Sequence, residues 1–127
     1  MAYKPKLEKD VRCPLEYGLD VFGGKWDSRI ICVLAEKGTL RYSEIRDDMT
    51  DITDAVLAST LKKLVGHDIV ARKQYNEMPL RVEYSLTERG TSVVPILRSI
   101  CRWSGMLRHE ETGEVLPQCK KCDYAAR

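Results

Sequence analysis

The sequence has no long hydrophobic run: no apolar stretch approaches the ~20 residues that a helix needs to cross a bilayer. Residues 1–12 also lack the apolar core of a signal peptide, so we expect a cytoplasmic protein with no membrane contact. Net charge is low, at +2. Overall basicity therefore does not indicate a nucleic-acid-binding protein, and such a role must rest on where the cations are placed.

The sequence also lacks the features of a disulfide-rich protein and of an enzyme. It has five cysteines, and an odd number in a cytoplasmic chain argues against a structural disulfide framework. It has no glycine-rich phosphate loop, no nucleophile elbow and no His-x-x-x-His, and neither His67 nor His109 belongs to a recognisable catalytic motif. We therefore expect a protein that is not an enzyme and needs no cofactor or metal.

The most informative segment predicts a helix followed by a β-hairpin. Residues 53–66 place leucines at i, i+4 and i+7, which is one face of a helix. Residues 69–75 and 80–86 read as two strands, and Pro79 in the turn keeps the strand ladder from continuing. A helix of this kind fits the DNA major groove, and a hairpin beside it reaches the flanking backbone. The pattern indicates a winged helix-turn-helix.

The remaining segments complete an α+β, mainly α fold: a winged helix-turn-helix with a long C-terminal dimerisation helix. Further helices are predicted over residues 14–22, 25–36, 43–49 and 88–109, with a short strand at 40–42. We divide the chain into a flexible N-terminal arm (1–12), a DNA-binding and dimerisation domain (13–110) and a C-terminal tail with a Cys-x-x-Cys pair (111–127).

Polar and basic side chains lie away from the leucine face of the helix 53–66 and on the hairpin. Hydroxyl and carboxylate groups there suit base edges or phosphates, and lysines and arginines suit phosphates. The predicted DNA contacts are Ser43, Thr53, Asp54, Ser59, Thr60, Lys62, Lys63, Arg72, Lys73 and Arg81. Arg41 and Arg46 can add further contacts. For any single lysine the alternative is a solvated surface with no DNA role.

Several motifs make the chain resemble the HxlR-type branch of the MarR-like winged-helix regulators of bacteria. These motifs are Cys13-Pro14, LDVFGGKW at 19–26, RYSEI at 41–45, LKKL at 61–64, PLRVEYSLT at 79–87 and the segment 95–103. The resemblance covers about residues 13–109. It implies a homodimeric transcription factor that reads DNA with the helix 53–66 and contacts the backbone with the hairpin, where Arg81 matches the family.

The chain departs from this family where the helix 53–66 begins. Relatives often have Ser-Gln-Lys-x-Leu-Thr, and this chain has Thr-Asp-Ala-Val-Leu-Ala at 53–58. Asp54 can accept a hydrogen bond from a cytosine amine, and an alanine can touch a thymine methyl group. A different operator and weak DNA binding both remain open.

The helix 88–109 is apolar around more than one face. Its apolar residues are Val93, Val94, Ile96, Leu97, Ile100, Cys101, Trp103, Met106 and Leu107. Such a helix must be covered on two sides, and the simplest cover is the same helix of a second subunit with the helix 14–22. A two-fold homodimer places its reading helices about 34–36 Å apart, which predicts a near-palindromic double-stranded DNA operator.

Cys13 is the candidate redox-sensing residue. It lies at the start of a predicted helix and next to Arg12, and both the helix dipole and the guanidinium favour the thiolate that oxidants and electrophiles attack. The resemblance agrees, because several relatives use the cysteine of this Cys-Pro position to sense quinones, aldehydes, diamide or hypochlorite. An inert, half-buried thiol at a dimer seam is the alternative.

The other cysteines have weaker signals. Cys32 is expected in the core. Cys101 can pair with Cys13 of another subunit if their Cα atoms come within ~7 Å. Cys119 and Cys122 are further candidate partners of Cys13, but one Cys-x-x-Cys pair is too few for a structural zinc site without other ligands. A redox dithiol and a tail without a role are the other possibilities.

We therefore expect a transcriptional regulator, with repression the favoured sign because the small chain has no evident surface for recruiting polymerase. The signal is a small oxidant or electrophile at Cys13. One alternative keeps DNA binding but drops the thiol switch, and places a small-molecule effector in the crevice between the dimer helices and the DNA-reading domain, lined by Trp26, Tyr17 and Trp103. Another is a winged-helix module that binds proteins and not DNA.

Overall fold

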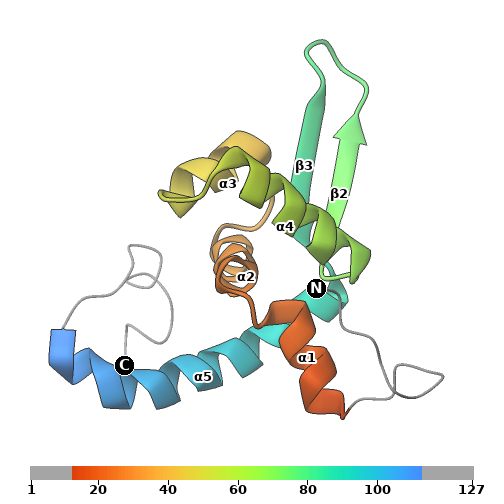
Figure 1. Ribbon diagram of the computed structural model, residues 1–127. Helices are drawn as coiled ribbons and strands as arrows, with labels where there is room; N and C mark the ends of the chain where they lie inside the picture. Colours follow the sequence, from red (N-terminus) through yellow and green to blue (C-terminus); the bar gives the residue numbers. More distant parts are fainter. Residues whose placement is uncertain (1–12, 113–127) are drawn as a thin grey trace.

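The computed structural model of the chain describes residues 13–112, and side chains as far as residue 105. The predicted N-terminal arm and most of the predicted tail, with Cys119 and Cys122, lie outside these residues. The elements are α1 (Pro14–Phe22), α2 (Lys25–Lys37), β1 (Leu40–Arg41), α3 (Tyr42–Met49), α4 (Asp54–Gly66), β2 (Val70–Tyr75), β3 (Arg81–Leu86) and α5 (Glu88–Thr112). The predicted α+β, mainly helical winged fold is confirmed (Figure 1).

The three strands form one antiparallel sheet in the order β1-β3-β2. Val70 pairs with Leu86 at the base of the hairpin, and Tyr75 pairs with Arg81 at its outer end. The hairpin of β2 and β3 projects beyond the helices, as a wing does (Figure 1). Strand β1 pairs with the middle of β3, at Glu83 and Tyr84, and so joins the start of α3 to the sheet.

The core forms where α2, α3 and α4 meet the base of the hairpin. Leu57, Leu61 and Leu64 are 0–2% exposed, which confirms the leucine face predicted for α4. They pack in one cluster with Ile30 of α2 and Ile45 of α3, which are both fully buried. Because α4 buries this face, its position is set by the same hydrophobic contacts that hold the domain together.

Two threonines begin the helices that matter most for function. The Thr53 hydroxyl oxygen accepts a hydrogen bond from the Val56 backbone N–H (3.2 Å), so Thr53 caps α4. Thr87 caps α5 in the same way by accepting from the Gly90 N–H (2.9 Å). Both caps are local signals that can be recognised in the sequence, because threonine is a favoured residue just before a helix.

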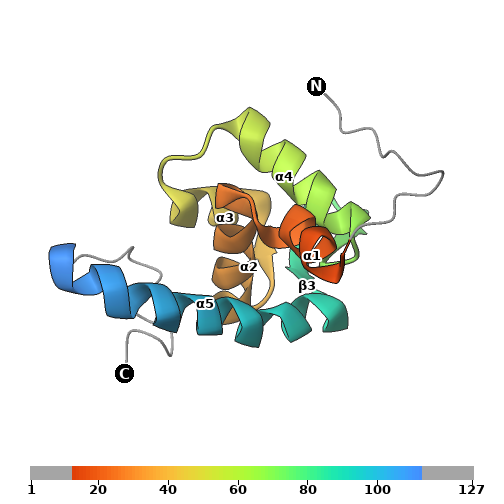
Figure 2. The ribbon, with the colours of Figure 1, turned by 60° about the horizontal axis from the view of Figure 1, so that its bottom comes forward.

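Helix α5 continues through Pro95 and runs to Thr112, three residues past the predicted end. It packs on the domain through buried Val93 and Leu97, while Ile96 and Ile100 are about half exposed. Its C-terminal half extends beyond the other helices, and α1 lies along its N-terminal half (Figures 1 and 2). None of the described helices is long and apolar enough to span a membrane.

Candidate nucleic-acid interface

Helix α4 turns the face opposite its leucines toward solvent. Ala55, Ala58, Ser59 and Lys62 are exposed and follow one another at i, i+3, i+4 and i+7, so they form one stripe along the helix. The Ser59 hydroxyl donates to the Val56 carbonyl (3.1 Å), which leaves its oxygen lone pairs for a ligand donor. We call these four residues the α4 stripe.

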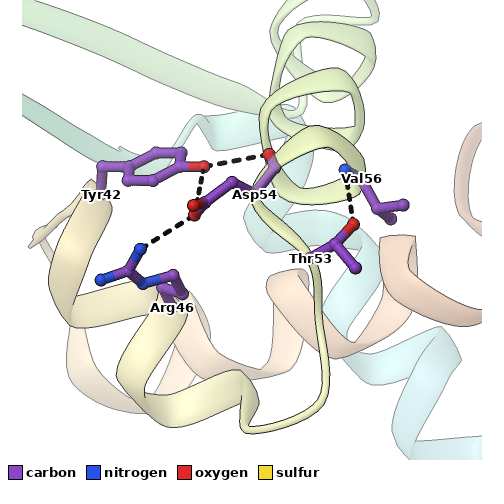
Figure 3. Close-up of polar contacts among 5 residues, drawn as sticks. All are labelled: Tyr42, Arg46, Thr53, Asp54 and Val56. Carbon is purple, nitrogen blue, oxygen red and sulfur yellow. Dashed lines mark hydrogen bonds and ion pairs between the residues drawn. The ribbon is translucent and has the colours of Figure 1, made fainter.

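The first turn of α4 is held by two residues of α3 (Figure 3). The Asp54 carboxylate lies 3.0 Å from an Arg46 guanidinium nitrogen. The Tyr42 hydroxyl donates to the Asp54 backbone carbonyl (3.1 Å) and to its carboxylate (3.4 Å). The hydrogen bond and the negative charge of Asp54 raise the pKa of Arg46, and partial burial together with Asp54 raises the pKa of Tyr42. Asp54, the acidic residue at the start of α4, is therefore partly neutralised.

Two predicted DNA contacts of α4, Thr60 and Lys63, are not part of the α4 stripe. Thr60 is 8% exposed, because it lies on the core side between Leu57 and Leu64. Its hydroxyl donates to the Val56 carbonyl (2.7 Å), which satisfies it inside the helix. The Lys63 ammonium pairs with Asp27 of α2 at 2.7 Å. Thr60 is thus misplaced as a DNA contact, and Lys63 is engaged within the protein.

Asp27 is a site residue that the sequence reasoning missed. It is 4% exposed, and its carboxylate also accepts a hydrogen bond from the Gly24 backbone N–H (3.2 Å). A local signal was available, since an acidic residue at the third position of a predicted helix can complete a capping box. Its pairing with Lys63, 36 positions away, had no such signal.

The wing carries three of the predicted DNA-contacting cations, of which two are exposed and the third is paired with carboxylates. Arg72 and Lys73 of β2 are exposed; Arg72 donates to Gln74 (3.2 Å) and Lys73 lies over the Tyr75 ring (4.9 Å). Arg81 instead stacks on Tyr75 at 3.9 Å.

Arg81 also pairs with two carboxylates. It lies 3.0 Å from Glu77 and 3.8 Å from Glu83, and its side chain is 28% exposed. Its Nε is buried and has no hydrogen-bond partner in the described part of the chain. Intramolecular contacts therefore hold Arg81 in place.

Comparison with known proteins agrees with this geometry. The HxlR-like helix-turn-helix family matches residues 21–112. The chain belongs to this family. It is 42% identical over 107 residues to an uncharacterized HTH-type transcriptional regulator of Methanothermobacter thermautotrophicus, covering 83% of this chain and 81% of the relative. This HxlR-like chain is therefore a helix-turn-helix transcriptional regulator, which is not a catalytic role.

Two of the solved structures that this chain resembles show regulators in a stated redox form. The redox regulator HypR in its oxidized form is 38% identical, with a TM-score of 0.69 over 76% of this chain and 98% of that one. Reduced YodB from B. subtilis is 32% identical, with a TM-score of 0.69 over 79% of this chain and 98% of that one. YodB has also been solved after diamide treatment and with a quinone bound.

Cys13 of this HxlR-like regulator lies at the start of α1 and is exposed. Its backbone carbonyl accepts from the Glu16 (3.0 Å) and Tyr17 (3.4 Å) N–H groups, so the residue is fixed by the first turn while its thiol faces outward. Cys101 of α5 is half-buried, and Cys32 packs against the core as expected.

Of the three residues predicted to line an effector crevice, Tyr17 lines a cavity in the described part of the chain. An open cavity of ≈ 630 Å³ lies between α1, the end of α4 and α5, and Tyr17, Phe22, His67 and Arg89 contribute to it. Trp26 and Trp103 do not line this cavity: Trp26 packs against the core beside Lys25 and Arg29, and Trp103 is 68% exposed on α5. Only Tyr17 of the three predicted residues is there.

Proposed function

We propose that this regulator is a homodimeric repressor that binds a near-palindromic operator with α4 in the major groove. The observation that carries the proposal is the division of α4 into a fully buried leucine face and an exposed α4 stripe. A helix anchored in this way can enter a groove without being displaced from its own domain. In Figure 1, α4 and the outer part of the wing lie on the side of the molecule opposite α5.

Within this interface the residues take different roles. Ser59, Asp54 and the exposed alanines face the base edges, where Asp54 keeps an oxygen for an exocyclic amine and the alanines meet methyl groups. The remaining contacts bind phosphates: Ser43, Thr53, Lys62, Arg72 and Lys73, with Arg81 contacting DNA only if it leaves Glu77. Phosphate contacts set the register and affinity, and base contacts set the sequence.

The dimer forms through α1 and α5. Both helices expose large apolar side chains: Leu15 is 69% exposed, Leu19 48%, Ile96 49%, Ile100 48% and Trp103 68%. Helix α1 lies next to the N-terminal half of α5 in both views (Figures 1 and 2). Exposed apolar side chains of this size on neighbouring helices are typical of an interface between subunits.

Oxidants or electrophiles act through Cys13. Its thiol is exposed at the start of α1, a helix of the proposed dimer interface, so an adduct or a disulfide there changes how the subunits meet. A differential energy of a few kcal/mol between two subunit arrangements is enough to change the DNA-competent population strongly. The redox names and ligands of HypR and YodB support this role.

A gel-shift assay tests the proposal. The protein is incubated with the DNA upstream of its own gene, first reduced and then after diamide or a quinone, beside the Cys13→Ser and Cys32→Ser variants. We expect all three reduced proteins to bind, and diamide to change binding by the wild type and Cys32→Ser but not by Cys13→Ser. A full response in Cys13→Ser contradicts the sensing role, and no binding by any protein contradicts the DNA-binding role.

A second candidate effector is a small molecule in the cavity between α1 and α5. The observation that favours it is the cavity itself, which joins aromatic Tyr17 and Phe22 to the basic Arg89. If such a molecule is the effector, operator binding is insensitive to diamide. A Phe22→Trp variant, whose larger side chain partly fills the cavity, then binds the operator with an affinity that no longer changes with the effector.

A further inference from the structure

Adjacent lysines of α4 have different surroundings. Lys62 ends the α4 stripe and is exposed. Lys63, one residue on, reaches back to α2, where its ammonium lies 2.7 Å from the Asp27 carboxylate. The Asp27 side chain is only 6% exposed, whereas that of Lys63 is 40% exposed. The pair is thus a buried anion covered by a half-exposed cation.

A buried carboxylate of this kind depends on its partners. Asp27 receives two donors, the Lys63 ammonium and the Gly24 N–H (3.2 Å) at the start of α2. A Cβ on Gly24 would lie 2.7 Å from the Asp27 carboxylate, so any other residue at this position would make the Asp27 side chain shift. Removing the cation leaves an uncompensated buried charge, and that is more costly than removing the whole pair.

We propose that Lys63 is a positioning residue: with Asp27 it fixes α4 against the start of α2, and it makes no phosphate contact. The proposal rests on the DNA binding proposed above. Its consequence is that only Lys62 of the two adjacent lysines contributes to the electrostatic part of DNA affinity. Lys63 acts by holding α4 at the angle at which the α4 stripe meets the groove.

The two roles give different signatures in salt titrations. Each phosphate contact contributes about 0.9 to the slope of log affinity against log salt concentration. Lys62→Met therefore lowers the slope of a dimer by about 1.8, since each subunit loses one contact. Lys63→Met leaves the slope unchanged and weakens binding by the same factor at every salt concentration.

A second substitution separates positioning from a phosphate contact. Asp27→Asn removes the buried charge and retains the acceptor for Gly24, so the Asp27→Asn/Lys63→Met protein recovers much of the affinity and of the melting temperature that Lys63→Met loses. Asp27 is buried and cannot replace a phosphate contact, so such a rescue has no explanation if Lys63 binds DNA directly. Lys62→Met, the matched control, keeps the wild-type melting temperature and is not rescued by Asp27→Asn.

The experiment combines fluorescence anisotropy with a labelled duplex and thermal unfolding of five proteins: the wild type, Lys62→Met, Lys63→Met, Asp27→Asn/Lys63→Met and Asp27→Asn/Lys62→Met. The proposal is overturned if Lys63→Met lowers the salt slope as Lys62→Met does, or if Asp27→Asn restores nothing. If the wild type binds no DNA, the proposed function fails and the positioning role fails with it. A melting temperature that is higher for Asp27→Asn/Lys63→Met than for Lys63→Met would then still show that Lys63 compensates the buried charge of Asp27.

Discussion

Raising the salt concentration should weaken DNA binding steeply, by an amount that follows from the free cations of the interface. Lys62, Arg72 and Lys73 are exposed, and none of them forms an ion pair with another described residue. If each contacts one phosphate, a dimer makes about six contacts, and the slope of log affinity against log salt is about −5.4. Raising KCl fourfold, from 50 to 200 mM, then lowers affinity about 2,000-fold.

The assay is an anisotropy titration of a labelled duplex at four KCl concentrations in this range. Arg46, Lys63 and Arg81 are not counted, because each is paired with a carboxylate. A slope shallower than about −2 contradicts the reasoning, because the exposed cations would then contact hardly any phosphates. A slope near −11 also contradicts the reasoning, because Arg46, Lys63 and Arg81 would then have to leave their carboxylates and contact phosphates as well.

Three other predictions test separate parts of the structure. In thermal unfolding, Gly90→Ala lowers the free energy of unfolding by about 1–3 kcal/mol, because the added Cβ would overlap the backbone carbonyl of Ile69, just before β2. Gly66→Ala is the control: a Cβ there has nothing within 4 Å, so the variant is neutral or stabilising in the same assay. Ile100→Glu places a charge in the proposed dimer interface, and sedimentation should show monomers; persistent dimers place the interface elsewhere. On a duplex without the operator, where no base contact is lost, Asp54→Ala releases Arg46 and removes a negative charge beside DNA, so the salt slope becomes steeper and affinity at low salt rises; an unchanged slope means that Arg46 does not face phosphates.

The elements that were predictable from the sequence depend on short-range signals. The α4 boundaries follow from the Thr53 cap and the leucine spacing, and the hairpin follows from two strand-like runs around Pro79. The first turn of α5 follows from Thr87. Each signal acts within a few residues, so one stretch of sequence was enough to interpret it.

The features that escaped prediction depend on which side chains meet once the chain is folded. The sequence assigned Lys63 to phosphate because nothing local marks Asp27, 36 residues away, as its partner. Thr60 was placed with the polar face, but its hydroxyl is satisfied within the helix and can therefore be buried beside the leucines. The state of Arg81 depends on a stacking contact with Tyr75 across the hairpin.

The most direct test of the account is a hydroxyl-radical footprint of the reduced protein on the DNA upstream of its gene. A dimer with α4 in successive major grooves predicts two protected segments, related by a near-palindrome and centred about 10 base pairs apart on one face of the duplex. A protein with Lys62→Met should give the same pattern at a higher protein concentration. A single protected segment contradicts the two-fold dimer, and an unprotected duplex under conditions where the protein is folded contradicts DNA recognition by α4.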